Sequence, residues 1–193
     1  AFIANLFFKQ KKYDQAIKEY EKLIRIDKSS IASWNMCGWA YYYAGKYDKA
    51  INAFSESKKI NPFLVEAHYG LAMSLAKTDE KDDAKDELSA AIKLDPYYTH
   101  TQDFVNLVKA NPKWNDLYKT LGWSYYNNQL YKLAAAAFKE YLAANTGDIE
   151  ALRGMAWSNY WLGQLDASYA GFKEILNDKA KDTDALVGTG WVL

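Results

Sequence analysis

The chain has 193 residues, of which half are hydrophobic and 16% aromatic, so it can build a packed core and is not a disordered segment. Lysine plus arginine equals aspartate plus glutamate at 24 each, which leaves no positive excess to attract nucleic acid or an anionic membrane. No apolar run is long enough to predict membrane insertion. The single cysteine, Cys37, excludes an internal disulfide and a thiolate metal cluster.

Residues 1–30 predict part of a helical hairpin, whose second helix covers Asp14 to Ile26. Ala1 to Phe8 is apolar but is followed by lysines rather than preceded by them, so it does not resemble a signal peptide. With no targeting segment, the sequence leaves the compartment open between cytoplasm and periplasm.

Residues 31–64 predict a complete hairpin and define a period of 34 residues. Steps of 34 connect Ala16 with Ala50 and Ala84, so small apolar positions recur in register. Gly45 marks the turn between two amphipathic helices, and Pro62 ends the second helix. The period is carried by Trp34, Gly38, Tyr41, Gly45, Tyr47, Ala50, Phe54 and Pro62.

Residues 65–98 repeat this pattern, and residues 99–114 interrupt it. The repeat is carried by His68, Leu71, Ala72, Leu75, Ala84, Leu88 and Pro96. The interruption contains an amphipathic stretch from about Thr101 to Ala110, which Asn111-Pro112 ends. This stretch predicts one extra helix, interpreted as the second helix of a half-repeat that has lost its first. We expect it to separate a block at residues 1–98 from one at residues 115–193.

The second block contains two repeats, residues 115–148 and 149–182, and a partial repeat at residues 183–193. Tyr118, Leu121, Gly122, Tyr125, Ala134 and Phe138 carry the first repeat. The second is weaker, with Leu152, Met155, Ala156, Asn159, Ser168 and Phe172, a turn at Gly163, and Ala180 in place of proline. Neither end of the chain has the polar outer face of a capping repeat, which favours an excerpt from a longer array.

The pattern from Trp34 to Pro62 resembles the tetratricopeptide repeat family, in which W-x2-L-G-x2-Y precedes A-x3-F and a proline. Cys37 stands where the family has leucine. The resemblance covers nearly the whole chain and implies an all-α, right-handed solenoid of helix-turn-helix repeats. It also implies a scaffold for protein–protein interaction whose first helices line a concave groove.

Aromatic residues repeat on the first helices and form the predicted partner-binding groove. A tryptophan and a tyrosine three or four residues apart share one helical face, which suits the anchoring of a peptide. Stacking of these rings on one another is an equally good interpretation. Lys119 and Arg153 are expected to pair with acidic groups of a ligand. The predicted groove residues are Trp39, Tyr42, Tyr43, Tyr69, Lys119, Trp123, Tyr126, Arg153, Trp157, Tyr160, Trp161 and Trp191.

The remaining polar residues of this face have mixed charge, which indicates a mixed ligand: Lys9, Glu66, Lys77, Asp116, Glu150 and Asp184. The lysine, asparagine and arginine that let related domains grip a chaperone's C-terminal carboxylate are missing, because Met36, Tyr69 and Met73 occupy their positions. Binding of a chaperone tail is therefore not expected.

Catalytic chemistry has little support in the sequence. The only histidines are His68, at a packing position, and His100, in the interruption, and no glycine-rich phosphate loop or metal-spaced cluster accompanies them. We expect no enzyme activity, no cofactor and no bound metal.

Two alternative functions stay open. The first is a carbohydrate-associated module of a bacterial polysaccharide secretion system, with aromatic rings stacked on sugars and Asn127 and Asn159 as hydrogen-bonding residues. The second is a self-assembling scaffold, in which the uncapped ends meet other copies of the chain.

Overall fold

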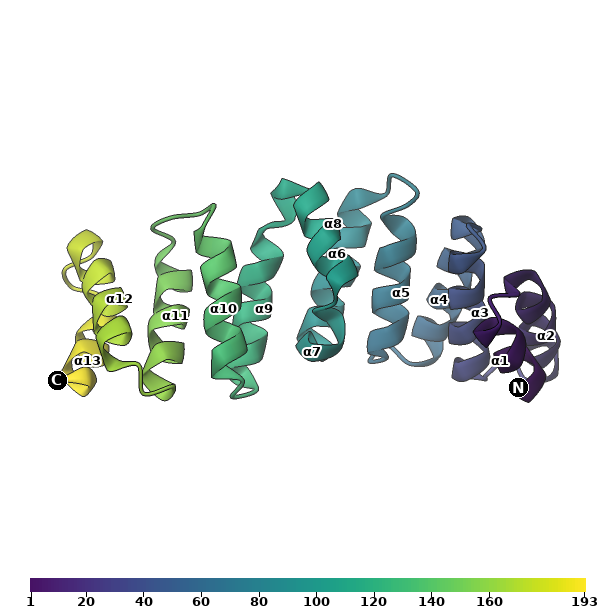
Figure 1. Ribbon diagram of the computed structural model, residues 1–193, viewed down its shortest axis with the longest axis horizontal. Coiled ribbons are helices and arrows are strands. Elements are labelled where there is room, and N and C mark those ends of the chain that lie inside the picture. The colour runs from purple at the N-terminus through teal and green to yellow at the C-terminus, as the bar shows by residue number, and fades with distance from the viewer. The chain divides into compact units, whose positions relative to one another are not determined.

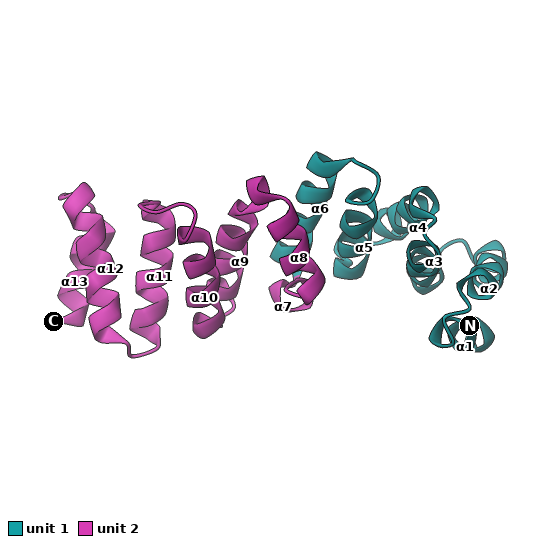
Figure 2. Ribbon diagram, turned by 45° about the horizontal axis from the view of Figure 1, so that its top comes forward, with its two compact units in different colours: residues 1–94 teal, residues 95–193 magenta.

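The computed structural model describes residues 1–193, and every regular element in it is helical, which confirms the all-α prediction. The chain divides into two compact units, residues 1–94 and 95–193 (Figure 2), and Figure 1 labels their helices. Unit 1 contains α1 (Phe2–Lys9), α2 (Tyr13–Ile26), α3 (Ile31–Tyr43), α4 (Tyr47–Ile60), α5 (Val65–Leu75) and α6 (Lys81–Leu94). Unit 2 contains α7 (Pro96–Thr99), α8 (Gln102–Ala110), the 3-10 turn η1 (Pro112–Trp114), α9 (Asp116–Asn127), α10 (Tyr131–Leu142), α11 (Ile149–Trp161), α12 (Leu165–Asp178) and α13 (Thr183–Val192).

Within each unit the repeats pack as consecutive helical hairpins. Unit 1 pairs α1 with α2, α3 with α4 and α5 with α6, while unit 2 pairs α9 with α10 and α11 with α12 and adds α13 against α12. The first helices of neighbouring hairpins also touch: α3 contacts α5 in unit 1, and in unit 2 α11 contacts both α9 and α13. The predicted solenoid of helix-turn-helix repeats is therefore confirmed, and each unit exposes a row of first helices.

The turn inside each hairpin uses one left-handed residue. Gly45 and Gly163 have φ values of 73° and 72°, as their turn positions predict. Lys11, Asp79 and Gln129 occupy the same position of the period in other hairpins and also have positive φ, between 58° and 67°. The backbone of this turn is thus common to all five hairpins, whether or not glycine is present.

The interruption contains the predicted extra helix, α8, which ends at Ala110 as expected. The Thr101 hydroxyl begins it by accepting a 3.2 Å hydrogen bond from the Phe104 amide. A one-turn helix, α7, precedes it and is not predicted by the 34-residue period. The Asp95 side chain caps α7 by accepting from the Tyr98 amide at 2.9 Å, and Pro96 is its first residue. Asp95-Pro96 thus begins a helical turn as well as ending α6, and the interpretation of α8 as the lone second helix of a half-repeat stays a prediction.

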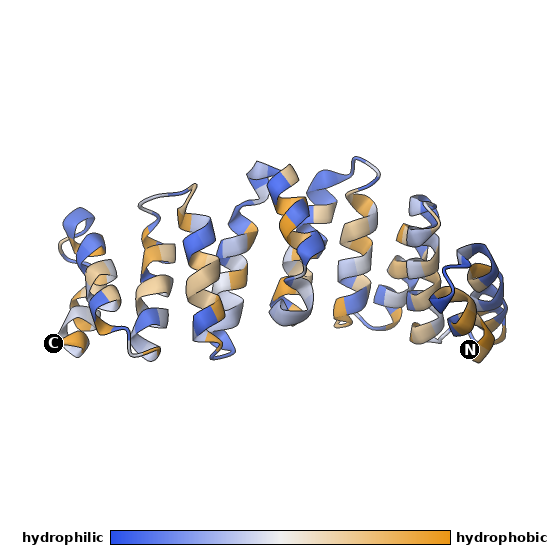
Figure 3. Ribbon diagram, viewed as in Figure 1, coloured by the Kyte–Doolittle hydropathy of each residue, from blue (hydrophilic) through white to orange (hydrophobic).

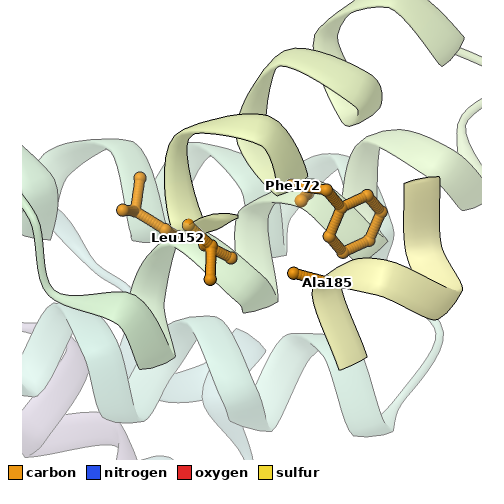
Figure 4. Close-up of a cluster of buried hydrophobic side chains, with 5 residues drawn as sticks. Leu152, Phe172 and Ala185 are labelled. Atoms are coloured by element: carbon orange, nitrogen blue, oxygen red, sulfur yellow. The ribbon is translucent and has the colours of Figure 1, made fainter. Parts of the chain in front are cut away.

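The core depends on pairs of large and small residues in adjacent helices. Phe54, Phe138 and Phe172 are fully buried, and each ring lies against glycine in the first helix of the next hairpin: Gly70, Gly154 and Gly188. A Cβ atom at any of these glycines would stand 2.3–2.4 Å from the ring. Figure 4 shows Phe172 beside Ala185 of α13, within the buried cluster that also contains Leu152. Glycine therefore sets how closely neighbouring hairpins approach.

Candidate partner-binding surface

The tryptophans at the centre of the first helices pack against the core phenylalanines. Trp39 in α3 meets Phe54 at a ring-centroid distance of 5.1 Å, Trp123 in α9 meets Phe138 at 5.1 Å, and both contacts are edge-to-face. Trp157 in α11 repeats the arrangement with Phe172 at 4.8 Å. All three indoles are partly buried, so packing accounts for much of their surface. These three tryptophans thus pack edge-to-face on the core of their own hairpins, a contact that differs from stacking of the groove rings on one another.

Other predicted groove residues expose more of their rings. Tyr43, Trp161 and Trp191 are 53%, 51% and 59% exposed, whereas Tyr69 is almost fully buried. Tyr42, Tyr126 and Tyr160 are partly buried. The surface available to a partner is therefore found mainly at the C-terminal ends of α3, α11 and α13.

In unit 2 these rings form one continuous cluster. Trp161 stacks on Tyr131 with centroids 5.8 Å apart, and its Nε1 donates a 3.1 Å hydrogen bond to the Tyr126 hydroxyl. Tyr160 lies 5.3 Å from Trp161 and 6.0 Å from Trp191. We call this cluster the aromatic surface of unit 2, and it comprises Tyr126, Tyr131, Trp157, Tyr160, Trp161 and Trp191. It connects α9, α10, α11 and α13.

Unit 1 has a smaller arrangement of the same kind. Tyr43 stacks on Tyr13 at 5.5 Å with nearly parallel rings, and Phe8 meets Tyr43 edge-on at 5.9 Å. Tyr13 and Tyr131 were not among the predicted groove residues. Both are the first residue of a second helix, as Tyr47 is in its hairpin, and that shared position is the signal that could have found them.

Beside these rings, unit 1 has an apolar pocket of about 530 Å³ between α1 and α3. It is lined by Phe2, Asn5, Leu6, Phe8, Lys9 and Met36. Phe2 is 80% exposed, and α1 is largely hydrophobic in Figure 3. The aromatic repeat pattern does not identify this pocket, because α1 has no tryptophan and the only lining residue from α3 is Met36.

The two predicted cations already have carboxylate partners in the chain. Lys119 Nζ lies 3.1 Å from both Asp148 Oδ2 and Glu150 Oε2. Arg153 repeats the arrangement one period later, because its Nη2 lies 2.7 Å from Asp182 and its Nε lies 3.4 Å from Asp184. Steps of 34 residues connect every member of the two sets, so the period itself is the signal that identifies these partners.

The inner carboxylate of each set also begins a helix. Asp148 accepts a 2.9 Å hydrogen bond from the Ala151 amide and one of 2.8 Å from the Tyr141 hydroxyl. Burial raises the pKa of Asp148, but these hydrogen bonds and Lys119 outweigh it, so the net pKa is lowered. Burial lowers the pKa of Lys119, and its two carboxylate partners more than reverse this effect. Both groups are therefore held in their charged forms at neutral pH.

His68, a residue type that often takes part in catalysis or metal binding, has structural partners. The ring nitrogens of His68 lie 2.6 Å from a Glu87 carboxylate oxygen and 2.9 Å from the Pro62 carbonyl oxygen. Histidine, cysteine, aspartate and glutamate side chains nowhere form a group of three or more suited to a metal ion. None of the helices combines the length and apolar character needed to cross a membrane.

Hairpins repeated every 34 residues, with an aromatic face on their first helices, define a helical-repeat solenoid. Family models confirm the class: one described as a TPR repeat matches residues 4–42, and models of the tetratricopeptide repeat match residues 31–64 and 65–98. Residues 4–98 therefore belong to the tetratricopeptide repeat family, and hairpins of the same 34-residue period continue through residues 115–182.

The chain is similar to parts of larger proteins. It is 31% identical over 90 residues to the tetratricopeptide repeat and J domain-containing co-chaperone DNJ1 of Cryptococcus neoformans, a match that covers 47% of this chain and 17% of the relative. It is 27% identical over 94 residues to anaphase-promoting complex subunit 3 of Schizosaccharomyces pombe, covering 49% and 14%. These matches span less than a fifth of either relative. Among solved structures, MamA has 23% identity and a TM-score of 0.49, with 93% of this chain and 95% of MamA covered.

Proposed function

We propose that this chain is a noncatalytic scaffold that binds a peptide or protein segment across the aromatic surface of unit 2. The observation that carries this proposal is the pair of half-exposed indoles, Trp161 and Trp191, in a cluster continuous over three first helices. When a partner covers large aromatic rings that contact water in the free protein, the removal of their apolar surface from water favours binding. Tyr43 offers a smaller surface of this kind in unit 1.

The packing of the inner rings supports this function. Trp157 is held by Phe172 on one side and lies 5.8 Å from Trp191, so the exposed ring rests on an ordered one. Side chains that are already fixed lose little conformational entropy on binding. Trp39, Trp123 and Trp157 therefore act mainly as supports, and Trp161 and Trp191 as contacts.

A protein is a better-supported partner than a glycan. Two relatives are a co-chaperone and a subunit of a named complex, which agrees with a role among other proteins. Of the two asparagines considered for sugar binding, Asn159 is buried in α11 and only Asn127 is exposed. The hydrogen-bonding groups that a sugar requires are thus fewer than the sequence suggests.

The test is affinity capture on the immobilised full chain from an extract of the native cell. The site variant combines Trp161→Ala with Trp191→Ala. The matched control combines Phe63→Ala with Tyr97→Ala, which removes two rings that are 79% and 74% exposed elsewhere. Circular dichroism confirms that each variant is folded.

We expect the parent and the control to retain the same protein and the site variant to lose it. Since the loss of one buried aromatic anchor typically weakens binding by about 2 kcal/mol, the affinity should fall by at least about tenfold. Equal retention by all three proteins would contradict the proposal.

A further inference from the structure

We infer that the partner segment bound by unit 2 is basic, with lysine or arginine side chains interspersed among apolar ones; this inference rests on the proposed function. Its basis is a pairing of carboxylate and indole that recurs on every first helix of unit 2. The pairs are Asp116 with Trp123, Glu150 with Trp157, and Asp184 with Trp191.

Each pair lies on one helical face. Residues seven apart in an α-helix are separated by two turns, or about 10 Å along the axis. Because the three helices lie side by side in unit 2, their carboxylates form one row and their indoles another. Trp157 and Trp191 of the indole row belong to the aromatic surface of unit 2. Trp123 borders that surface, because its ring centroid lies 5.6 Å from that of Tyr126.

The charge of this face is negative. With their N-cap residues, α11 and α13 carry four carboxylates, Asp148, Glu150, Asp182 and Asp184, and the two cations paired with them are Lys119 and Arg153, which leaves two negative charges. Each of these cations lies within 3.4 Å of two carboxylates. An acidic ligand would have to displace these internal partners, whereas a basic ligand meets charge that the cations do not balance.

The outer carboxylates are accessible to such a ligand. The side chains of Glu150 and Asp184 are 57% and 63% exposed, although each already contacts one cation. A carboxylate has two oxygens and can accept several hydrogen bonds, so a second cation can share it. Lysine and arginine also stack favourably over exposed indoles, and their aliphatic stems cover apolar surface. Charge and ring chemistry therefore favour the same kind of segment.

Unit 1 provides a contrast within the same chain. Its helix α3 carries no charged residue, and in α5 the acidic position, Glu66, is followed seven residues later by Met73 rather than tryptophan. The complete carboxylate–indole pairing is thus confined to the first helices of unit 2. Glu66 serves as a matched control position.

The experiment titrates the full chain with three short peptides and follows tryptophan emission and heat. The peptides repeat Lys-Leu-Ser, Glu-Leu-Ser or Ser-Leu-Ser at equal length, with blocked termini. The site variant combines Glu150→Gln with Asp184→Asn, and the control combines Glu66→Gln with Asp166→Asn, which removes the same number of negative charges. We expect the lysine peptide to bind the parent most tightly, to bind the site variant about fivefold more weakly or worse, and to bind the control as it binds the parent.

Raised salt should weaken binding of the lysine peptide to the parent, because the outer carboxylates are exposed. A glutamate peptide that binds as tightly as the lysine peptide, or a site variant that keeps the parent's affinity, would overturn the inference. Equal binding of the lysine and serine peptides, lost in the Trp161→Ala and Trp191→Ala variant, would overturn the inference but leave the proposed function standing. Lysine-peptide binding that survives in that tryptophan variant would overturn both.

Discussion

The ring of Phe138 in α10 lies directly against Gly154 in α11, so that a Cβ atom on Gly154 would stand 2.3 Å from the ring's Cζ atom. No side chain larger than hydrogen fits there without movement of the ring or the helix. Because Phe138 is fully buried, neither movement has free space available.

Substitution of Gly154 by alanine should therefore destabilise the chain. We expect Gly154→Ala to lower the free energy of unfolding by about 1–3 kcal/mol, because overpacking in a dense core outweighs the gain in helix propensity. Urea unfolding measures the change. The control is Gly190→Ala in α13, where a Cβ atom meets nothing within 4 Å and alanine should be neutral or stabilising by up to about 1 kcal/mol. Equal effects of the two substitutions would contradict this account of Gly154.

The hairpin turn gives a prediction of opposite sign. Gln129 has a φ of 60°, a conformation in which a Cβ atom is strained, whereas the equivalent Gly163 is not strained. We expect Gln129→Gly to raise the free energy of unfolding by about 0.5–1 kcal/mol and Gly163→Ala to lower it by about 1 kcal/mol. Thermal unfolding of both variants tests this. A loss of stability in Gln129→Gly would show that its side chain has a stabilising contact that outweighs the strain.

The ion pair of Arg153 predicts how stability depends on pH. A hydrogen bond from the Ala185 amide lowers the pKa of Asp182 below 3.8, burial opposes this, and Arg153 lowers it further. A carboxyl with a lower pKa in the folded state adds stability that is complete above about pH 5 and is lost as the pH falls through the folded pKa. Asp182→Asn keeps a good helix cap but removes the charge, so it should be less stable than the parent at pH 7 and match it near pH 2.

Urea unfolding across this pH range provides the measurement. Asp182→Ala removes the cap as well and should lose about 1 kcal/mol more than Asp182→Asn at every pH. A constant difference between the parent and Asp182→Asn from pH 7 to pH 2 would show that the charge of Asp182 does not stabilise the fold.

Cys37 should be unreactive in the folded chain. It is 1% exposed in α3, and burial, followed by the nearby charge of Glu21, raises the pKa of its thiol to about 12. Because the thiolate is the reactive form, a thiol reagent at pH 8 should label Cys37 slowly in buffer and rapidly in urea. Rapid labelling of the native protein would mean that α3 opens readily.

The sequence predicts the hairpins well because each period repeats the same large and small positions. The fully buried Phe54, Leu88 and Phe138 were all expected at the centre of their hairpins. The turn glycines, Gly45 and Gly163, also follow from the period. These features depend on residue size and backbone conformation, which a repeated pattern specifies directly. The division into residues 1–98, 99–114 and 115–193 stays a prediction. The compact units themselves are divided in the chain between Leu94 and Asp95.

The surface is harder to predict, because a residue's position on a helix does not fix what its side chain contacts. Trp157 and Trp161 lie on the same face of α11, yet the first packs on Phe172 and the second is half exposed. Arg153 was expected to meet a ligand, but its carboxylate partners come from residues 29 and 31 positions further along the chain. Such contacts form between repeats, whereas the period describes each repeat by itself.

The contact of phenylalanine with the following hairpin's glycine also limits how this chain can be shortened or lengthened. The phenylalanine belongs to one repeat and its glycine to the next. A new junction between repeats therefore preserves the core only when it restores this phenylalanine–glycine contact. Excision of residues 139–172, one full period, would place Gly188 where Phe138 now meets Gly154. Removal of one residue more or fewer would bring Thr189 or Val187 to that position instead. Duplications and deletions compatible with this core are therefore restricted to whole periods.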